Sequence, residues 1–273
     1  MMRVGVDGRV TLWPVSSGTV MLALEGGGSK TDTIKAIEIH RLYIHLIIDT
    51  LSLEGYRPTM NYIAERRLEE KERRRAEILD ATEAVAASVG WDAMTMDQVA
   101  RKARLSRALV YVYFKDKTDL MFGIGERALA TLHQCFADAV AKHATGLEQL
   151  GAIGHAYIAY SRDHAVYFDV MARCELISTD MANLQPNEQA CLLGGDAVRQ
   201  LMQSALELGV RDGSIRADVG EAKAVTVCLW GFIHGVIQLS SAKAKMLAHD
   251  GLHPRELLEQ AMLMATRSLM QPG

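Results

Sequence analysis

The sequence predicts an all-α protein made of a small three-helix unit followed by a larger helical domain. Apolar residues recur at helical spacing through residues 73–89 and again, segment after segment, from residue 119 onward. Between these regions, residues 95–117 (TMDQVARKARLSRALVYVYFKDK) have the pattern of two short helices joined by a tight turn. The 273 residues suffice for two domains of this kind.

The first helix of the three-helix unit is expected over residues 73–89. Gly90 is then well placed as a left-handed residue that ends the helix, and Trp91 can fold back onto the last turn. The residues of the expected buried stripe are Ile78, Thr82, Val85 and Val89.

The two short helices each begin at a residue that can cap them. Thr95 and Gln98 have the spacing of a capping box, and Ser106 is suited to cap the second helix. The turn between them is residues 104–106. Asp116 and Asp119 repeat the capping pattern at the start of a longer helix.

The second short helix should bury one face and expose the other. Val110 and Phe114 lie four residues apart and should face the core. The residues expected to face outward are Arg107, Ala108, Tyr111 and Val112. A short helix held in this way can enter the major groove of DNA.

Positive charge is concentrated in this motif. Residues 101–117 contain six basic residues and one acidic residue, whereas the whole chain has a net charge of −3. Such a cluster neutralises phosphates and makes binding salt-dependent. The alternative is a solvated helical hairpin whose charges have no specific role.

The sequence GW…TMDQVARKARLSRALVYVYFKDKTDL resembles the N-terminal domain of the TetR/AcrR family of one-component bacterial regulators. The resemblance implies a homodimeric repressor that binds a roughly palindromic operator in double-stranded DNA and is released by a small-molecule effector. It also implies contacts to bases or phosphates from Arg107, Ala108, Leu109, Tyr111, Val112, Tyr113 and Lys117. Thr95, Arg104 and Ser106 complete the predicted DNA-binding set.

The motif departs from the family pattern at two positions. Arg104 stands in the turn where the family usually has glycine, and Leu109 stands where a threonine is frequent. Leu109 and Val112 can instead contact thymine methyl groups. Three other functions stay open: an activator, an effector-independent regulator, or a helical binding protein or enzyme whose hairpin contacts protein.

The rest of the chain is expected to be helical and to bind the effector. Ser178–Gly195 is expected to be a loop or a short helix beside a pocket. Gly123 and Gly125, early in the helix after the motif, predict either close packing against the first helix or a flexible joint between domains. The expected helices are Asp119–His143, Leu147–Asp163, Ala165–Leu176, Asp196–Leu208, Glu221–Ala242 and Pro254–Met270.

The helix that contains Trp230 is apolar on nearly every face, so a partner subunit is its natural cover. The run Trp230–Gly235 has the pattern W-x-x-x-H-G and resembles the signature of one subgroup of TetR-type C-terminal domains. A monomeric core is the alternative to a dimer. The residues predicted at the dimer interface are Trp230, Gly231, His234, Gly235, Leu258, Ala261, Met262 and Ala265.

An effector pocket is expected among the middle helices, although core packing is the alternative for each candidate. The candidates are His155, Tyr157, Tyr160, Tyr167, Phe168, Met171, Trp230 and His234. We find no Ser-His-Asp set, paired carboxylates or metal-ligand spacing, so neither catalysis, a cofactor nor a metal is predicted. The four cysteines are far apart and fit free thiols of a reducing cytoplasm, with a redox sensor as the alternative.

Three regions follow from these patterns. Residues 61–118 are expected to form the helix-turn-helix domain, and residues 119–273 the effector-binding and dimerisation domain. Residues 1–60 match neither, and lack the pattern of a signal peptide or a membrane span. The resemblance begins only after Met60, so residues 1–59 are expected to be a disordered extension or an over-long gene assignment, and the protein to be cytoplasmic.

Overall fold

The computed structural model describes residues 4–5, 9–15, 19–24, 59–177 and 180–271. The chain divides into two compact units, residues 1–67 and 68–273, which we describe separately.

In the N-terminal unit three strands pair in the order β1-β2-β3, and both pairings are antiparallel. They are β1 (Val4–Gly5), β2 (Arg9–Val15) and β3 (Thr19–Leu24). Leu12 lies opposite Leu22 in the β2–β3 pairing. Most of the segment that was expected to be a disordered extension or an over-long gene assignment, including residues 25–58, lies outside the described residues.

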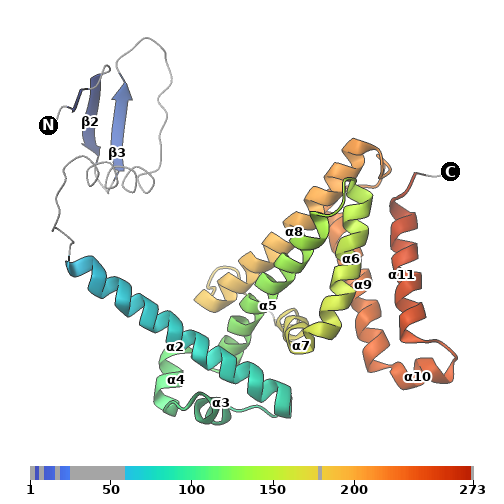
Figure 1. Cartoon of the computed structure of the whole chain (residues 1–273), viewed down its shortest axis with the longest axis horizontal. Helices are drawn as coiled ribbons and strands as arrows, with labels where there is room; N and C mark the ends of the chain where they lie inside the picture. Colours follow the sequence, from blue (N-terminus) through green and yellow to red (C-terminus); the bar gives the residue numbers. More distant parts are fainter. Residues whose placement is uncertain (1–3, 6–8, 16–18, 25–58, 178–179, 272–273) are drawn as a thin grey trace. The chain divides into compact units, whose positions relative to one another are not determined.

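Three helices form the unit that was predicted around the basic motif (Figure 1). They are α2 (Thr59–Val89), α3 (Met96–Ala103) and α4 (Arg107–Tyr113). Ile78, Val99 and Val110 are fully buried between them. Gly90 has a φ of 81° and Trp91 is buried, as predicted, because the left-handed residue turns the chain back over the end of α2. Val89 was predicted in the buried stripe but is 43% exposed, so that assignment is wrong.

Seven further helices follow among the described residues after α4, and α5 is central among them (Figure 1). It packs against α6, α7 and α8, and α9 packs against α8 and α11. Their bounds are α5 (Lys117–Val140), α6 (Gly146–Asp163), α7 (Ala165–Cys174), α8 (Pro186–Asp212), α9 (Ala222–Ala242), α10 (Ala244–His249) and α11 (Pro254–Leu269).

The start of α8 differs most from the prediction. The helix begins at Pro186, ten residues before the expected Asp196, and it runs through Gly194 and Gly195. The N–H groups in the first turn of a helix have no partner within the helix, so a proline there removes no hydrogen bond. Pro186 therefore starts α8 rather than breaking it. A Cβ atom on Gly194 would lie 3.1 Å from Cβ of Leu129 on α5, so packing explains this small residue.

The two glycines early in α5 pack closely, each on a different partner. A Cβ atom on Gly123 would lie 2.9 Å from Phe114 and 3.0 Å from Leu79 of α2, which confirms close packing against the first helix. A Cβ atom on Gly125 would instead meet the sulfur atoms of Cys174 and Cys191.

Helix α9 is the only helix among the described residues whose length and composition would let it cross a membrane. Core helices of soluble proteins share this property, so it does not by itself indicate a membrane span. Ile233 and Ile237 of α9 are buried in the core of the C-terminal helices.

Candidate DNA-binding site and effector cavity

Reciprocal side-chain hydrogen bonds fix the start of α3. The Thr95 hydroxyl accepts from the backbone N–H of Gln98 (3.2 Å), and the Gln98 side chain accepts from the N–H of Thr95 (2.8 Å). Ser106 accepts from the N–H of Leu109 (3.2 Å) at the start of α4. The two predicted caps are confirmed, and they satisfy N–H groups that the helices leave unpaired.

The turn between α3 and α4 depends on a strained residue. Arg104 has a φ of 57° and is the only non-glycine residue with positive φ in the described part of the chain. Its N–H bonds to carbonyl groups of the last turn of α3. Arginine therefore takes the left-handed conformation that glycine would adopt more easily, and its side chain is exposed beside α4.

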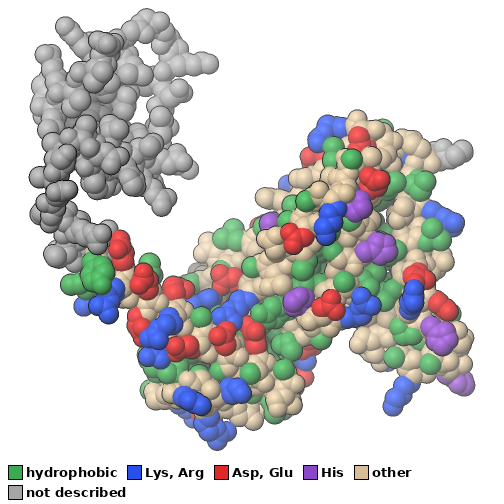
Figure 2. All heavy atoms as spheres, viewed as in Figure 1, with side chains coloured by type: hydrophobic (Ala, Val, Ile, Leu, Met, Phe, Trp, Pro, Cys, Tyr) green, Lys and Arg blue, Asp and Glu red, His purple; other side chains and the backbone are tan. Residues whose placement is uncertain are grey.

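Helix α4 has one buried and one exposed face. Val110 and Phe114 are fully buried, whereas Tyr111 is 40% and Val112 is 77% exposed. Lys and Arg side chains gather around these helices at the lower edge of the molecule in Figure 2. Of the other predicted DNA-binding residues, those that are exposed are Thr95, Arg104, Ser106, Arg107 and Ala108, and those that are half-buried are Leu109, Tyr113 and Lys117.

Two neighbours hold the Arg107 side chain at the surface. Its Nε lies 3.1 Å from Oδ1 of Asp97 on α3, and its guanidinium lies 5.5 Å from the centre of the Tyr111 ring. Arg107 also donates to the Tyr111 hydroxyl (3.4 Å). This arrangement orients a charged donor and an aromatic ring together, and Asp97 is a site residue that the sequence analysis missed.

Lys117 is connected to α7 through the loop after α2. Its Nζ donates to the carbonyl oxygen of Asp92 (3.0 Å) and lies 5.9 Å from the centre of the Trp91 ring. The Asp92 carboxylate accepts two hydrogen bonds from Arg173 of α7, at 2.7 and 3.0 Å. These bonds lower the pKa of Asp92. A movement of α7 would therefore shift Lys117, which is predicted to contact a phosphate.

A second hydrogen-bonded path leads from α8 to the region after α4. Asn187 of α8 accepts from Arg75 of α2 (2.8 Å) and donates to Asp119 of α5 (2.8 Å). Asp119 in turn accepts from the backbone N–H of Lys115 (2.9 Å). The beginning of α8 is thus tied to the segment that joins α4 to α5.

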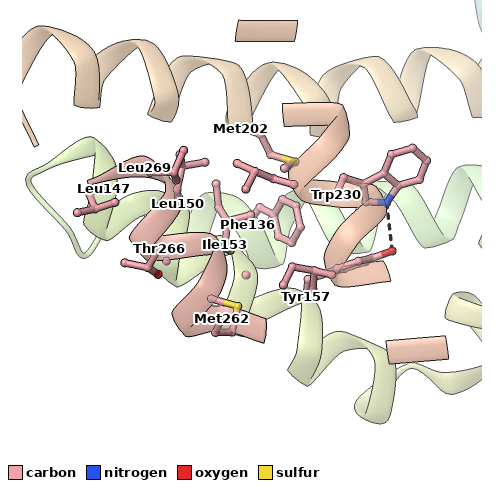
Figure 3. A pocket seen from close by; sticks show the side chains of 15 residues that line it. Phe136, Leu147, Leu150, Ile153, Tyr157, Met202, Trp230, Met262, Thr266 and Leu269 are labelled. Atoms are coloured by element: carbon pink, nitrogen blue, oxygen red, sulfur yellow. Dashed lines mark hydrogen bonds between the residues drawn. The ribbon is translucent and has the colours of Figure 1, made fainter. Parts of the chain in front are cut away.

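Two cavities lie between the C-terminal helices. One has about 870 Å³ of free space, including the part open to solvent, and lies beside α5, α7 and α8. The other has about 550 Å³, lies between α6, α9 and α11, and is almost entirely apolar (Figure 3). The side chains shared by their linings form a partition between them: Phe136, Tyr157, Met202 and Trp230.

A polar cluster lies behind this partition. Trp230 Nε1 donates to the Tyr157 hydroxyl (3.4 Å, Figure 3), which lies 2.7 Å from Nδ1 of His234. Nε2 of His234 lies 3.7 Å from a carboxylate oxygen of Glu175, which lines the larger cavity. Burial lowers the pKa of His234 and raises the pKa of Glu175 to about 7, so at neutral pH the imidazole is mostly uncharged and the carboxyl group is protonated in about half of the molecules.

The predicted effector residues have different positions. Tyr157, Met171 and Trp230 line the larger cavity. His234 lies behind the partition, and Phe168 packs against it with ring centres 5.0 Å apart.

Three other candidates line neither of these two cavities. His155 is exposed, Tyr160 donates to the carbonyl of Ala128 (2.8 Å), and Tyr167 donates to Glu83 (3.0 Å). The cavity residues that the sequence analysis missed include Phe122, Phe136, Cys174, Glu175, Cys191, Arg199 and Met202. They come from helices far apart in the chain, so no local pattern joins them.

The predicted dimer residues fall into two groups. His234, Ala261 and Met262 are buried within the protomer, and Trp230, Leu258 and Ala265 are half-buried. Gly231 and Gly235 are exposed, and a Cβ atom on either would meet nothing within 4 Å. Further apolar side chains of α9 and α11 are exposed: Val227, Phe232, Leu239, Leu263 and Met264.

Comparison with known proteins agrees with this architecture. The profile of bacterial regulatory proteins of the tetR family matches residues 78–124, and the profile of tetracyclin repressor-like C-terminal domains matches residues 150–265. A search among curated proteins finds no match.

Solved structures share the fold at low sequence identity. A Rhodococcus sp. RHA1 protein of unknown function is 21% identical with a TM-score of 0.58, covering 72% of this chain and 95% of its own. A tetR-family regulator from Rhodococcus RHA1 is 17% identical with a TM-score of 0.53, covering 73% and 98%. FadR from Bacillus subtilis, solved with stearoyl-CoA, is 14% identical with a TM-score of 0.55, covering 71% and 98%.

The two profiles cover the helix-turn-helix unit and most of the C-terminal helices, in the order that the fold requires. The chain therefore belongs to the TetR family of transcriptional regulators.

Proposed function

We propose that the protein is a cytoplasmic, homodimeric transcriptional repressor that binds a roughly palindromic operator and releases it when an effector binds. The observation that carries this proposal is the exposed face of α4. Arg107, Tyr111 and Val112 project from a helix whose caps and buried face fix its orientation. A charged donor, an aromatic ring and an apolar side chain suit base edges and thymine methyl groups.

Dimerisation is supported by the exposed face of α9 and α11. Each glycine in a helix interior costs about 1 kcal/mol relative to alanine, and the protomer gives Gly231 and Gly235 no close neighbour in return. A second copy of α9 that approaches at these glycines explains them and covers Phe232. A two-fold axis there would present two α4 helices to half-sites about one helical turn of DNA apart, roughly 34 Å.

The larger cavity is the proposed effector site. Its lining is mostly apolar with Glu175 and Arg199 among the polar groups, so the effector is a mostly apolar molecule with a polar end. The partition consists only of side chains, so its rotation can join both cavities into one long space. The stearoyl-CoA bound by FadR from Bacillus subtilis supports a ligand with a long apolar chain.

Release requires that the effector bind the DNA-free state more tightly. The larger cavity is lined by residues of α7 and α8, and each of these helices is hydrogen-bonded to the DNA-binding unit. A ligand that separates α7 from α8 would shift Asp92 and Asp119, and with them Lys117 and the end of α4.

The test is a gel-shift titration of the purified protein with the DNA upstream of its own gene. We expect a linear fall in log affinity with log salt concentration, and loss of the shift with one or more members of a panel of fatty acids, acyl-CoA esters and other apolar compounds. Sedimentation velocity should show a dimer that Phe232→Glu converts to monomer, whereas Met246→Glu, on exposed α10, should leave it intact. Failure of the protein to bind this DNA at low salt would contradict the proposal.

A further inference from the structure

The fold brings together two cysteines that are distant in the sequence. Cys174 is the last residue of α7, and Cys191 lies in the second turn of α8. Their sulfur atoms lie 3.3 and 2.9 Å from one point, the position that a Cβ atom on Gly125 would occupy. Only glycine at this position of α5 leaves room for both sulfur atoms, and both cysteines line the larger cavity.

We propose that Cys174 and Cys191 form a dithiol site that reduces an apolar organic hydroperoxide within the cavity and closes to a disulfide. This activity goes beyond the reversible binding of an effector, because the ligand is consumed and the protein is covalently changed. Neither Cys135 nor Cys228 lines this cavity, and Cys228 is exposed.

The roles of the two sulfur atoms follow from their positions. Cys174 ends α7, where the negative end of the helix dipole disfavours a thiolate, whereas Cys191 lies near the positive N-terminal end of α8. The proximity of the two sulfur atoms acts in the same direction, since it lowers the pKa of Cys191 and raises the pKa of Cys174. Cys191 is therefore the more easily formed thiolate, and the thiolate is the nucleophile. Cys174 is the last residue of α7, so a shift of its side chain toward Cys191 leaves the helix before it intact.

The reaction has two balanced steps. The Cys191 thiolate attacks the terminal oxygen of the hydroperoxide, the O–O bond breaks, and the alcohol leaves with the proton that the Cys191 thiol lost. The resulting Cys191 sulfenic acid is then attacked by Cys174. Its S–O bond breaks, a disulfide forms and water leaves with the Cys174 proton, so two thiols are oxidised and one hydroperoxide is reduced.

The lining of the cavity selects the class of hydroperoxide. Phe122, Leu129 and Met171 surround the thiols with apolar surface, and hydrogen peroxide gains nothing from it. Burying even part of a phenylpropyl group against such surface should favour an organic hydroperoxide by about ten-fold. Among the described residues no three His, Cys, Asp or Glu side chains could hold a metal ion together, so the pair is better suited to oxidation than to metal binding.

A disulfide would also pull α7 toward α8. Arg173, next to Cys174, bonds Asp92, and Asn187, one turn before Cys191, bonds Asp119. We expect operator affinity to fall about ten-fold on oxidation, within the usual range of coupling between sites. This part rests on the proposed repressor function, whereas the chemistry of the thiols does not.

The experiment treats the reduced full-length protein with cumene hydroperoxide or with hydrogen peroxide and follows free thiols and peptide masses. We expect a cross-linked peptide pair containing Cys174 and Cys191, formed about ten times faster with cumene hydroperoxide. Persistence of both thiols, or equal rates with the two oxidants, would overturn the proposal. Wild-type protein suffices for this measurement, so no variant has to fold.

Variants then assign the roles. Cys174→Ser should leave a Cys191 sulfenic acid that dimedone traps, and Cys191→Ser should leave Cys174 unlabelled. The matched control, Cys135→Ser with Cys228→Ser, should form the disulfide at the wild-type rate. Dimedone labelling of Cys174 rather than Cys191 would contradict the assignment.

Gly125→Ala tests the geometry, since its methyl group must push the two sulfur atoms apart. We expect the disulfide to form several-fold more slowly, whereas Gly151→Ala, whose methyl group would meet nothing within 4 Å, should leave the rate unchanged. An unchanged rate in Gly125→Ala counts against the site.

Regulation is judged separately by gel shift. Oxidation should weaken operator binding about ten-fold, and dithiothreitol should restore it. A disulfide without any change in affinity would refute the coupling, whereas a reduced protein that never binds DNA would refute the repressor function instead.

Discussion

The DNA-binding unit and the region around the two cavities, from α5 to α11, use the same kind of helix in different ways. In the unit formed by α2, α3 and α4, Ile78, Val99, Val110 and Phe114 are fully buried, and the open hollow that α2 and α4 share with α5 and α8 is lined mainly by charged and polar residues. Between α5 and α11, two cavities share the side chains of Phe136, Tyr157, Met202 and Trp230 as a partition. Dense packing fixes the orientation of α4, whereas incomplete packing lets the surrounding helices move.

Two glycine substitutions should separate these regions most clearly. Gly123→Ala places a methyl group 2.9 Å from Phe114 and 3.0 Å from Leu79, and overpacking of this kind costs about 1–3 kcal/mol. Gly151→Ala, beside the smaller cavity, meets open space and should gain up to about 1 kcal/mol from helix propensity. Urea unfolding measures both free energies. Equal effects would show that the DNA-binding unit is no more tightly packed than the cavity region.

The next largest effect is expected on DNA binding. Arg107→Ala removes the charged donor that Asp97 and Tyr111 orient, and should weaken operator binding by about 1–3 kcal/mol. Arg162→Ala removes an exposed arginine at the end of α6 and serves as the matched control. Fluorescence anisotropy with a labelled operator gives both affinities. If the two variants bind equally well, the outward face of α4 does not contact the DNA.

A smaller effect should follow from the strained turn. Arg104→Gly relieves a left-handed conformation and should raise the free energy of unfolding by about 1 kcal/mol. Arg104→Ala removes the same charge but keeps most of the strain, so the two variants differ only in backbone freedom. Thermal unfolding measures the difference. Similar midpoints for both would mean that the loop stores no strain at this residue.

The smallest effect concerns Glu175 in the larger cavity, because its side chain is 36% exposed and water screens its charge. Burial raises its pKa to about 7 from an ordinary value near 4.5, so the folded protein holds this proton more tightly than the unfolded chain. Its contribution to stability is thus full below pH 4.5, falls between pH 4.5 and 7, and is lost above pH 7. Glu175→Gln should stabilise the protein relative to wild type at pH 8 more than at pH 5, as measured by urea unfolding. The opposite trend would place the carboxylate in water.

The DNA-binding unit was predictable because short-range rules determine it. Thr95, Ser106 and Gly90 act on residues no more than four positions away, and all three have the predicted roles. The family resemblance added the identity of the unit. Asp97 escaped because its role depends on a contact with Arg107 across the turn.

The region around the two cavities was less predictable because segments distant in the sequence determine it. Gly194 was interpreted as part of a break in the helix, but it lies inside α8. Leu129 of α5 occupies the space above it, and this contact explains why the residue is small. The cysteine pair was hidden in the same way, since nothing in the sequence indicates that Cys174 and Cys191 share a cavity with Gly125. Helix periodicity predicted most of the helices. It did not predict the cavities between them or which face of α9 and α11 is exposed.

The partition between the cavities has an evolutionary consequence. Because side chains alone separate the two spaces, a single exchange at Trp230 or Met202 would change the length of molecule that fits, and the helices would stay where they are. A relative with this architecture could therefore come to accept a longer or shorter molecule through one mutation, with its DNA-binding unit unchanged.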